Sequence, residues 1–181
     1  MWTLGIDTSN YATSLAVFDT AAREVVCSIK RFLPVKEGQL GLRQSEALFH
    51  HTSVLPQMLQ ELAEHADLTR VERVGASARP RPVEGSYMPC FLAGVSAASA
   101  FAAARNLPLL HTTHQQGHIA AALLATGERE LFGRECLVFH ISGGTTDLIL
   151  YLSLIHISGR GRGDSGDGNA GRKRKLCIRH G

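Results

Sequence analysis

Two histidines four residues apart are the sharpest chemical feature of this 181-residue sequence. They are His114 and His118, in the segment His-Gln-Gln-Gly-His. On a helix, positions i and i+4 lie on one face about 5–6 Å apart, so both imidazoles can reach one metal ion. Zinc peptidases with this spacing place a general-base glutamate after the first histidine, but Gln115 stands there. The spacing predicts two metal ligands without peptidase chemistry; the alternative is two unrelated histidines.

A glycine pair flanked by hydroxyl groups separates two apolar runs further along the chain. Gly143 and Gly144 follow Ser142 and precede Thr145 and Thr146. Such a turn exposes backbone N–H groups and lets a phosphate or adenylate approach without a Cβ in the way. A plain hairpin turn is the alternative interpretation.

A third candidate site follows the first apolar run, where the sequence reads Asp7-Thr8-Ser9. Asp7, at the expected end of a strand, could hold a metal ion or a water molecule. The alternative is an Asx or Ser/Thr turn, in which these side chains only stabilise a hairpin.

Apolar periodicity predicts the elements that must position these residues. Residues 2–7, 12–19 and 24–32 are expected to form three consecutive strands. Apolar side chains at spacings of three and four predict a helix over residues 44–66. Pro56 fits the first turn of that helix if it begins near Ser53, or kinks a longer helix. Further strands are expected over residues 71–78, 107–111, 136–141 and 146–152, and further helices over 91–105 and 114–126.

The order of these elements indicates an α/β fold, because three meandering strands precede alternating helices and strands. A ribonuclease-H-like lobe is one known fold with this order. The glycine pair near residue 144 restarts the strand-turn-strand pattern of residues 6–14, as the opening of a second, similar lobe would.

Composition excludes collagen-like and wholly disordered classes, since 44% of the residues are apolar and 19% are charged. The formal net charge of +3 suggests a nucleic-acid partner, but residues 153–181 hold seven basic and two acidic residues. The preceding 152 residues are therefore slightly acidic. The four cysteines form no CxxC pair, which removes support for zinc-ribbon and thioredoxin-type sites. Without a charged leader or a long apolar stretch, we expect a cytoplasmic protein with no membrane association.

Five segments in collinear order carry a family resemblance: LGIDTSN, RQSEALFHHTSVLP, RPVEGSYMPCFLAGVSAASAFA, HQQGH and HISGGTTDLIL. Over about residues 2–152, the chain resembles the TsaD-type tRNA threonylcarbamoyladenosine synthases, formerly called glycoprotein endopeptidases. The resemblance implies the actin/Hsp70/sugar-kinase superfold, with two ribonuclease-H-like lobes. It also implies transfer of a threonylcarbamoyl group from threonylcarbamoyl-adenylate to the adenosine beside the tRNA anticodon. Partner subunits of a threonylcarbamoylation complex are a further expectation.

The resemblance also assigns site residues. His114 and His118 match the two family histidines that bind one divalent metal ion, iron or zinc. The family segment that contacts the adenylate or ATP-type ligand falls on His140, Ile141, Ser142, Gly143 and Gly144. Further candidates are Asp7, Thr8, Ser9 and Thr145. The resemblance assigns no catalytic residue in this chain.

Several positions depart from the family pattern and suggest a divergent bacterial branch. Thr145 replaces a histidine, the run from Asp7 to Ala12 is less acidic, and RPRPVEG over 79–85 replaces a glycine-proline-glycine turn. The third metal ligand of the family, a late aspartate, has no counterpart, and neither does most of the second lobe. We therefore expect a truncated N-terminal portion that is inactive alone.

The expected domains are a first lobe over 1–132, the first hairpin of an incomplete second lobe over 133–152, and a disordered tail over 153–181. The start of this tail resembles translated sequencing-adapter sequence, which favours a non-native origin over a native tail. Two other functions stay open: a non-catalytic scaffold subunit of the same complex, whose known forms lack the histidine pair, and an ATP-binding kinase-like member of the superfold.

Overall fold

The computed structural model of the chain describes residues 1–35, 42–141 and 146–151. It contains two compact units, residues 1–118 and residues 119–181, which are described separately. The predicted glycine turn at 142–145 and the predicted tail at 153–181 lie outside the described residues. The predicted division after residue 132 stays a prediction.

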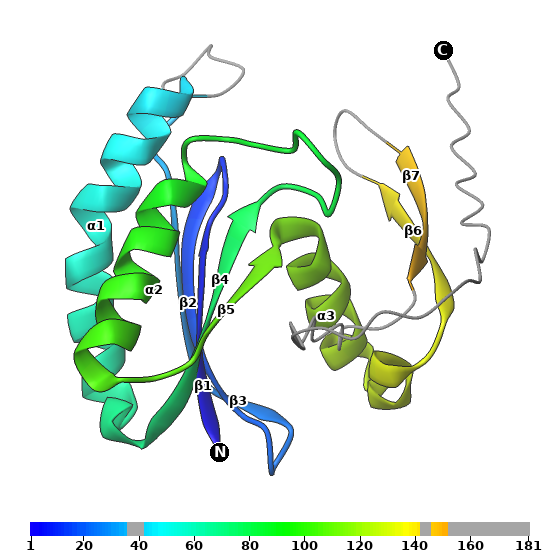
Figure 1. The fold of residues 1–181 in the computed structure, drawn as a ribbon, viewed down its shortest axis with the longest axis horizontal. Coiled ribbons are helices and arrows are strands. Elements are labelled where there is room, and N and C mark those ends of the chain that lie inside the picture. Colours follow the sequence, from blue (N-terminus) through cyan, green and yellow to red (C-terminus); the bar gives the residue numbers. More distant parts are fainter. Residues whose placement is uncertain (36–41, 142–145, 152–181) are drawn as a thin grey trace, which may run out of the picture. The chain divides into compact units, whose positions relative to one another are not determined.

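A five-stranded mixed sheet forms the first unit (Figure 1). Strands β1 (Trp2–Thr8), β2 (Ala12–Asp19) and β3 (Glu24–Phe32) form the predicted antiparallel meander. Strands β4 (Val71–Arg79) and β5 (Leu109–Thr113) extend the sheet in parallel with β1. The resulting order, β3-β2-β1-β4-β5, is that of a ribonuclease-H-like lobe, and the predicted α/β class is confirmed.

Two helices, α1 (Gln44–His65) and α2 (Phe91–Arg105), cover one face of this sheet (Figure 1). Helix α3 (His114–Thr126) begins directly after β5, and the division between the two units falls within it. A short 3₁₀ helix, η1 (Leu68–Arg70), precedes β4, and another, η2 (Arg129–Gly133), follows α3.

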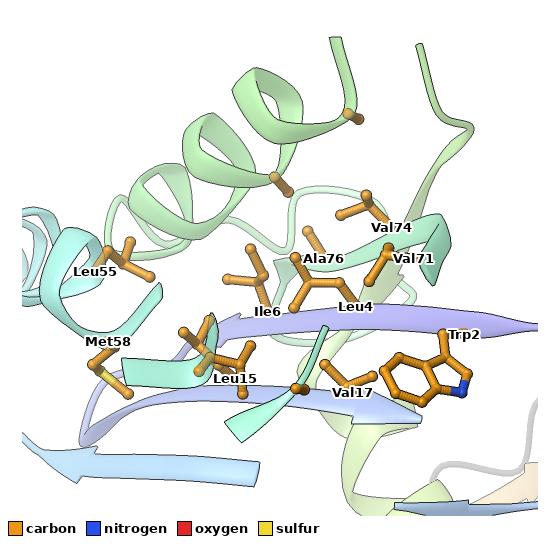
Figure 2. Packing of buried hydrophobic residues seen from close by; sticks show 14 of the residues in the cluster. Trp2, Leu4, Ile6, Leu15, Val17, Leu55, Met58, Val71, Val74 and Ala76 are labelled. Atoms are coloured by element: carbon orange, nitrogen blue, oxygen red, sulfur yellow. The ribbon is translucent and has the colours of Figure 1, made fainter. Parts of the chain in front are cut away.

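The hydrophobic core lies between the sheet and the two covering helices (Figure 2). Because side chains alternate along a strand, Leu4 and Ile6 of β1 face this core while Asp7 faces the opposite side. Each large aliphatic side chain buried here contributes about 1.5–3 kcal/mol relative to an exposed one. The strands contribute Trp2, Leu4, Ile6, Leu15, Val17, Val71, Val74 and Ala76, and the helices contribute Leu55, Met58, Leu62, Ala93, Ala98 and Ala102.

Strand β5 begins two residues later than the sequence predicts, so the expected strand over 107–111 is wrong at both ends. Asn106 adopts a left-handed conformation at φ 50°, and the N–H of Leu107 donates to the carbonyl of Ala102. This is the hydrogen-bonding pattern that closes the end of a helix. Leu107 therefore completes the cap of α2 and does not pair in the sheet.

Helix α1 runs through Pro56, so of the two alternatives for this proline the structure shows the longer helix and not a start near Ser53. Pro56 has no N–H to offer to the preceding turn. In that turn the hydroxyls of Thr52 and Ser53 donate to the carbonyls of Leu48 and Phe49, both at 2.8 Å. These bonds use backbone acceptors close to the proline.

The second unit contains a two-stranded antiparallel sheet of β6 (Cys136–Ile141) and β7 (Thr146–Tyr151). The predicted strand over 136–141 is confirmed, and β7 agrees with the second predicted strand as far as residue 151; residue 152 lies outside the described residues. Alternate side chains of β6 (Leu137, Phe139 and Ile141) are exposed. Within the described ranges, no helix combines the length and apolar character needed to cross a membrane.

Candidate functional site

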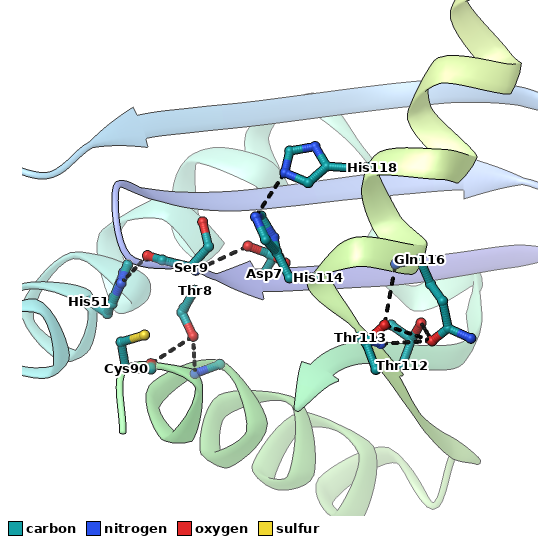
Figure 3. A network of polar contacts seen from close by, with 11 residues as sticks. Asp7, Thr8, Ser9, His51, Cys90, Thr112, Thr113, His114, Gln116 and His118 are labelled. Atoms are coloured by element: carbon teal, nitrogen blue, oxygen red, sulfur yellow. Dashed lines mark hydrogen bonds and ion pairs between the residues drawn. The ribbon is translucent and has the colours of Figure 1, made fainter. Parts of the chain in front are cut away.

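Asp7 stands at the end of β1 and uses its two carboxylate oxygens differently. Oδ1 accepts the N–H of Ser9 at 3.0 Å, which makes the Asx turn considered as an alternative for this segment. Oδ2 lies 2.9 Å from Nδ1 of His114, a residue 107 positions further along the chain (Figure 3). The fold thus joins the first strand to the first residue of α3.

His114 and His118 face each other as their spacing predicts. Their Nε2 atoms lie 2.8 Å apart, and their ring centroids are 4.2 Å apart. An ionised carboxylate can only accept hydrogen bonds, so the Nδ1–H group of His114 donates the hydrogen bond to Asp7. In the neutral imidazole this leaves the lone pair of His114 on Nε2, directed toward His118.

This arrangement is the one in which a carboxylate orients a metal-binding histidine. Asp7 contacts the nitrogen of His114 that faces away from His118, so it fixes the ring and its tautomer instead of adding a ligand between the two imidazoles. Within the described part of the chain, no group of three or more histidine, cysteine, aspartate or glutamate side chains could hold a metal ion. The pair therefore presents two imidazole nitrogens, whereas a structural metal site usually has four ligands.

The Asp7 carboxyl keeps its charge despite partial burial. Burial raises its pKa, but the hydrogen bond and charge of His114, together with hydrogen bonds from Ser77 and Ser9, outweigh that effect. The pKa of Asp7 therefore lies below its ordinary value, and the carboxylate is ionised near neutral pH.

His51 is a buried member of the same network that the sequence reasoning missed. Its Nε2 lies 2.8 Å from the carbonyl oxygen of Ser9, and its Nδ1 lies 2.7 Å from Oγ1 of Thr13 (Figure 3). Nε2–H must donate to the carbonyl, so Nδ1 accepts from the Thr13 hydroxyl. Desolvation lowers the pKa of His51, which favours this neutral form. Its position between Ala47 and Leu55 on the apolar stripe of α1 was the available signal.

Thr8 serves the packing of α2 on the sheet. Its hydroxyl donates to the carbonyl of Cys90 at 2.9 Å and accepts the N–H of Gly94 at 3.1 Å. Burial raises the pKa of the neighbouring Cys90 thiol to about 11, so this cysteine stays protonated. Ser9 enters the network through its backbone N–H and carbonyl.

The remaining predicted site residues belong to the second unit. His140 and Ile141 lie in β6, in register with Asp147 and Thr146 of β7. Ser142, Gly143, Gly144 and Thr145 lie outside the described residues. The structure brings together Asp7, His114 and His118, and the ligand role of the glycine turn stays a prediction.

Comparisons with solved structures show distant likenesses. YeaZ from Pseudomonas aeruginosa aligns over 82% of this chain and 66% of that chain, with a TM-score of 0.46 and 16% identity. The Aquifex aeolicus member of the Ppx/GppA family aligns over 84% of this chain and 48% of that chain, with a TM-score of 0.43 and 19% identity.

Sequence comparisons are more specific. A protein of Streptococcus suis (strain 05ZYH33) named tRNA N6-adenosine threonylcarbamoyltransferase is 31% identical over 146 residues, which cover 81% of this chain and 41% of that protein. Namesakes from Dehalococcoides mccartyi (strain CBDB1) and Archaeoglobus fulgidus are 31% and 28% identical, over 43% and 42% of their lengths. The chain thus spans about two fifths of these curated relatives. The family model TsaD, described as tRNA N6-adenosine threonylcarbamoyltransferase, matches residues 35–161, and the chain belongs to this family.

Proposed function

We propose that this chain provides the histidine-bearing part of a tRNA N6-adenosine threonylcarbamoyltransferase. The donor would be threonylcarbamoyl-adenylate, and the acceptor would be the adenosine beside the tRNA anticodon. The observation that supports this role best is the Asp7–His114–His118 arrangement, found in a chain of this family. With tRNA as its substrate, the protein would act in the cytoplasm. It would act there together with partner subunits of a threonylcarbamoylation complex.

The two imidazoles would hold one divalent ion, iron or zinc, through their Nε2 atoms. Such an ion supplies Lewis-acid polarisation of a carbonyl group. Asp7 would keep the proton of His114 on Nδ1, which leaves Nε2 available as a ligand. Further ligands would come from beyond the described residues or from the substrate. Residues 140–144 would contact the adenylate.

Metal binding is tested on the 181-residue chain by titration calorimetry with Zn²⁺ or with Fe²⁺ under anaerobic conditions. We expect one ion per chain, and loss of that binding in His114→Ala and His118→Ala. His65→Ala removes an exposed histidine near the end of α1 and should bind like the wild type. Unchanged binding in both site variants would contradict the assignment.

Transfer is tested on a fusion of residues 1–151 to the C-terminal part of the Streptococcus suis relative, because the chain matches 41% of that protein. Incubation with tRNA and threonylcarbamoyl-adenylate, followed by mass spectrometry of the nucleosides, should show the modified adenosine. The same fusion carrying His114→Ala should give none. A fusion that binds metal but modifies no tRNA would exclude the proposed reaction.

A further inference from the structure

A separate pocket lies across the first turn of α3 from the histidine pair. Gln116 is two residues from both His114 and His118, which places it on the opposite side of the helix. Figure 3 shows it turned toward Thr112 and Thr113. The pocket has a volume of about 430 Å³, which lies in the range of small-molecule sites, about 300–1,000 Å³. Its lining consists of Ala78, Arg79, Pro82, His111, Thr112, Thr113 and Gln116.

The orientation of the Gln116 amide is fixed by its neighbours. Its Oε1 accepts the backbone N–H of Thr113 at 3.0 Å, and also the hydroxyls of Thr113 and Thr112 at 3.0 and 3.1 Å. A backbone N–H can only donate, so the oxygen and not the nitrogen must face the threonines. The amide nitrogen points away from them (Figure 3) and has no acceptor among the described residues. The pocket wall thus offers two unused N–H donors.

Arg79 reaches the pocket because β4 is irregular at its end. Ser77 pairs with Thr112 and Arg79 pairs with Thr113, so Ala78 is skipped in the ladder. Such a bulge redirects the side chain that follows it. The guanidinium of Arg79 has no ion-pair partner in the described ranges, and no acidic residue lines the pocket. His111 adds an imidazole, which carries an N–H donor in its neutral and protonated forms alike.

We propose that this pocket binds the oxyanion group of a small metabolite, a phosphate ester or a carboxylate. Among the described residues, the lining of this cavity includes a permanent cation, Arg79, and the Gln116 amide with its unused N–H donors, and it includes no carboxylate. The planar guanidinium can pair with two oxygens of one phosphate or carboxylate. The pocket also lies at the carboxyl ends of parallel strands β4 and β5, where α/β sheets commonly bind ligands. This site is independent of the proposed transfer reaction.

The test follows backbone amide signals of residues 111–116 by NMR in the 181-residue chain at constant ionic strength. Inorganic phosphate, ribose 5-phosphate and acetate are titrated separately. At least one of them should shift these signals saturably. Arg79→Gln should weaken that binding about tenfold or more, since a hydrogen bond to a charged group contributes about 1.5–3 kcal/mol. Arg73→Gln, an exposed arginine of the same strand with the same charge change, is the matched control and should bind like the wild type.

The three probes separate the possible sources of the oxyanion. Equal affinity for phosphate and ribose 5-phosphate indicates recognition of the phosphate group alone, tighter binding of the ester indicates a sugar phosphate, and tighter binding of acetate indicates a carboxylate. Arg79→Lys, which keeps the charge but loses the two-pronged geometry, should bind with intermediate affinity. The proposal fails if none of the probes shifts these signals saturably, or if Arg73→Gln weakens binding as much as Arg79→Gln. Neither readout involves tRNA or metal, so failure here leaves the transfer reaction untouched.

Discussion

Asp7 ties the turn after β1 to the histidine pair, and removing its carboxylate should weaken metal binding. In Asp7→Ala the Nδ1–H of His114 loses its acceptor, so the ring and its tautomer are no longer fixed. Loss of such a partner typically costs about 10–100-fold in metal affinity, measurable by Zn²⁺ titration. Asp7→Asn retains an acceptor oxygen, so its metal affinity should lie between those of the wild type and Asp7→Ala. Glu72→Ala, an exposed acidic residue of β4, is the control. Wild-type affinity in Asp7→Ala would show that the carboxylate does not support the ligand.

His51 should make the stability of the first unit depend on pH. Desolvation lowers its pKa in the folded chain below the ordinary value of 6.5. As the pH falls below 6.5, the unfolded chain therefore binds the proton first, and the folded state loses stability. In His51→Gln, which keeps one donor and one acceptor, the free energy of unfolding should fall less between about pH 7.5 and about pH 5.5. Urea unfolding at each pH measures this free energy in the wild type and in His51→Gln. Identical pH profiles of the two proteins would show that His51 does not cause the pH dependence.

For single residues, the sequence predicts which side chains belong to the candidate site better than it predicts the contacts that these side chains make. The i, i+4 spacing of His114 and His118 is a local property, and the structure shows the two rings together. The contact between Asp7 and His114 spans 107 residues and exists only because β4 pairs with β1 on one side and β5 on the other. His51 was missed because a histidine inside an apolar helix pattern gives no sign of its partners in another element.

The contact between α2 and β1 is so close that a Cβ at position 94 would clash with Thr8. A Cβ built on Gly94 would lie 2.8 Å from Oγ1 and 3.2 Å from Cγ2 of Thr8. Gly94→Ala must move the helix or break the Thr8 hydrogen bonds, so we expect the unfolding free energy to fall by about 1–3 kcal/mol. Gly75→Ala, whose added Cβ meets only the carbonyl oxygen of Leu4 at 4.0 Å, should change it far less. Equal urea midpoints for the two variants would contradict this account of the packing.

Element positions follow the sequence closely where alternation is strong, as along β2 and β3, whose predicted bounds agree with the structure. The observed bounds differ from the predicted ones where hydrogen bonds at the end of a helix or strand determine its last residue. The N–H of Leu107 caps the end of α2, so β5 begins only at Leu109. The bulge after Ser77, which places Arg79 opposite Thr113, likewise has no signature in apolar periodicity.

The distribution of apolar burial separates the two units of the molecule. The first unit has a core enclosed by five strands and two helices. Among the described residues of the second unit, β6 and β7 form a two-stranded sheet whose Leu137, Phe139 and Ile141 are 65%, 71% and 76% exposed. An isolated two-stranded hairpin is only marginally stable in water. The relatives from Streptococcus suis and Dehalococcoides mccartyi are more than twice as long as the regions matched, so we infer that additional chain covers this face in proteins of that length.

Hydrogen exchange should reveal this difference in the 181-residue chain. Amides of β1 and β4 are buried in the centre of the sheet and should exchange only through global opening of the first unit. Amides of β6 and β7 should exchange at least about tenfold faster, because opening the hairpin exposes little additional apolar surface. In the fusion with the C-terminal part of the Streptococcus suis relative, protection of β6 and β7 should rise while that of β1 stays constant. Equal protection of all four strands in the 181-residue chain would show that the hairpin is already stabilised without further chain, and the inferred covering layer would then be unnecessary.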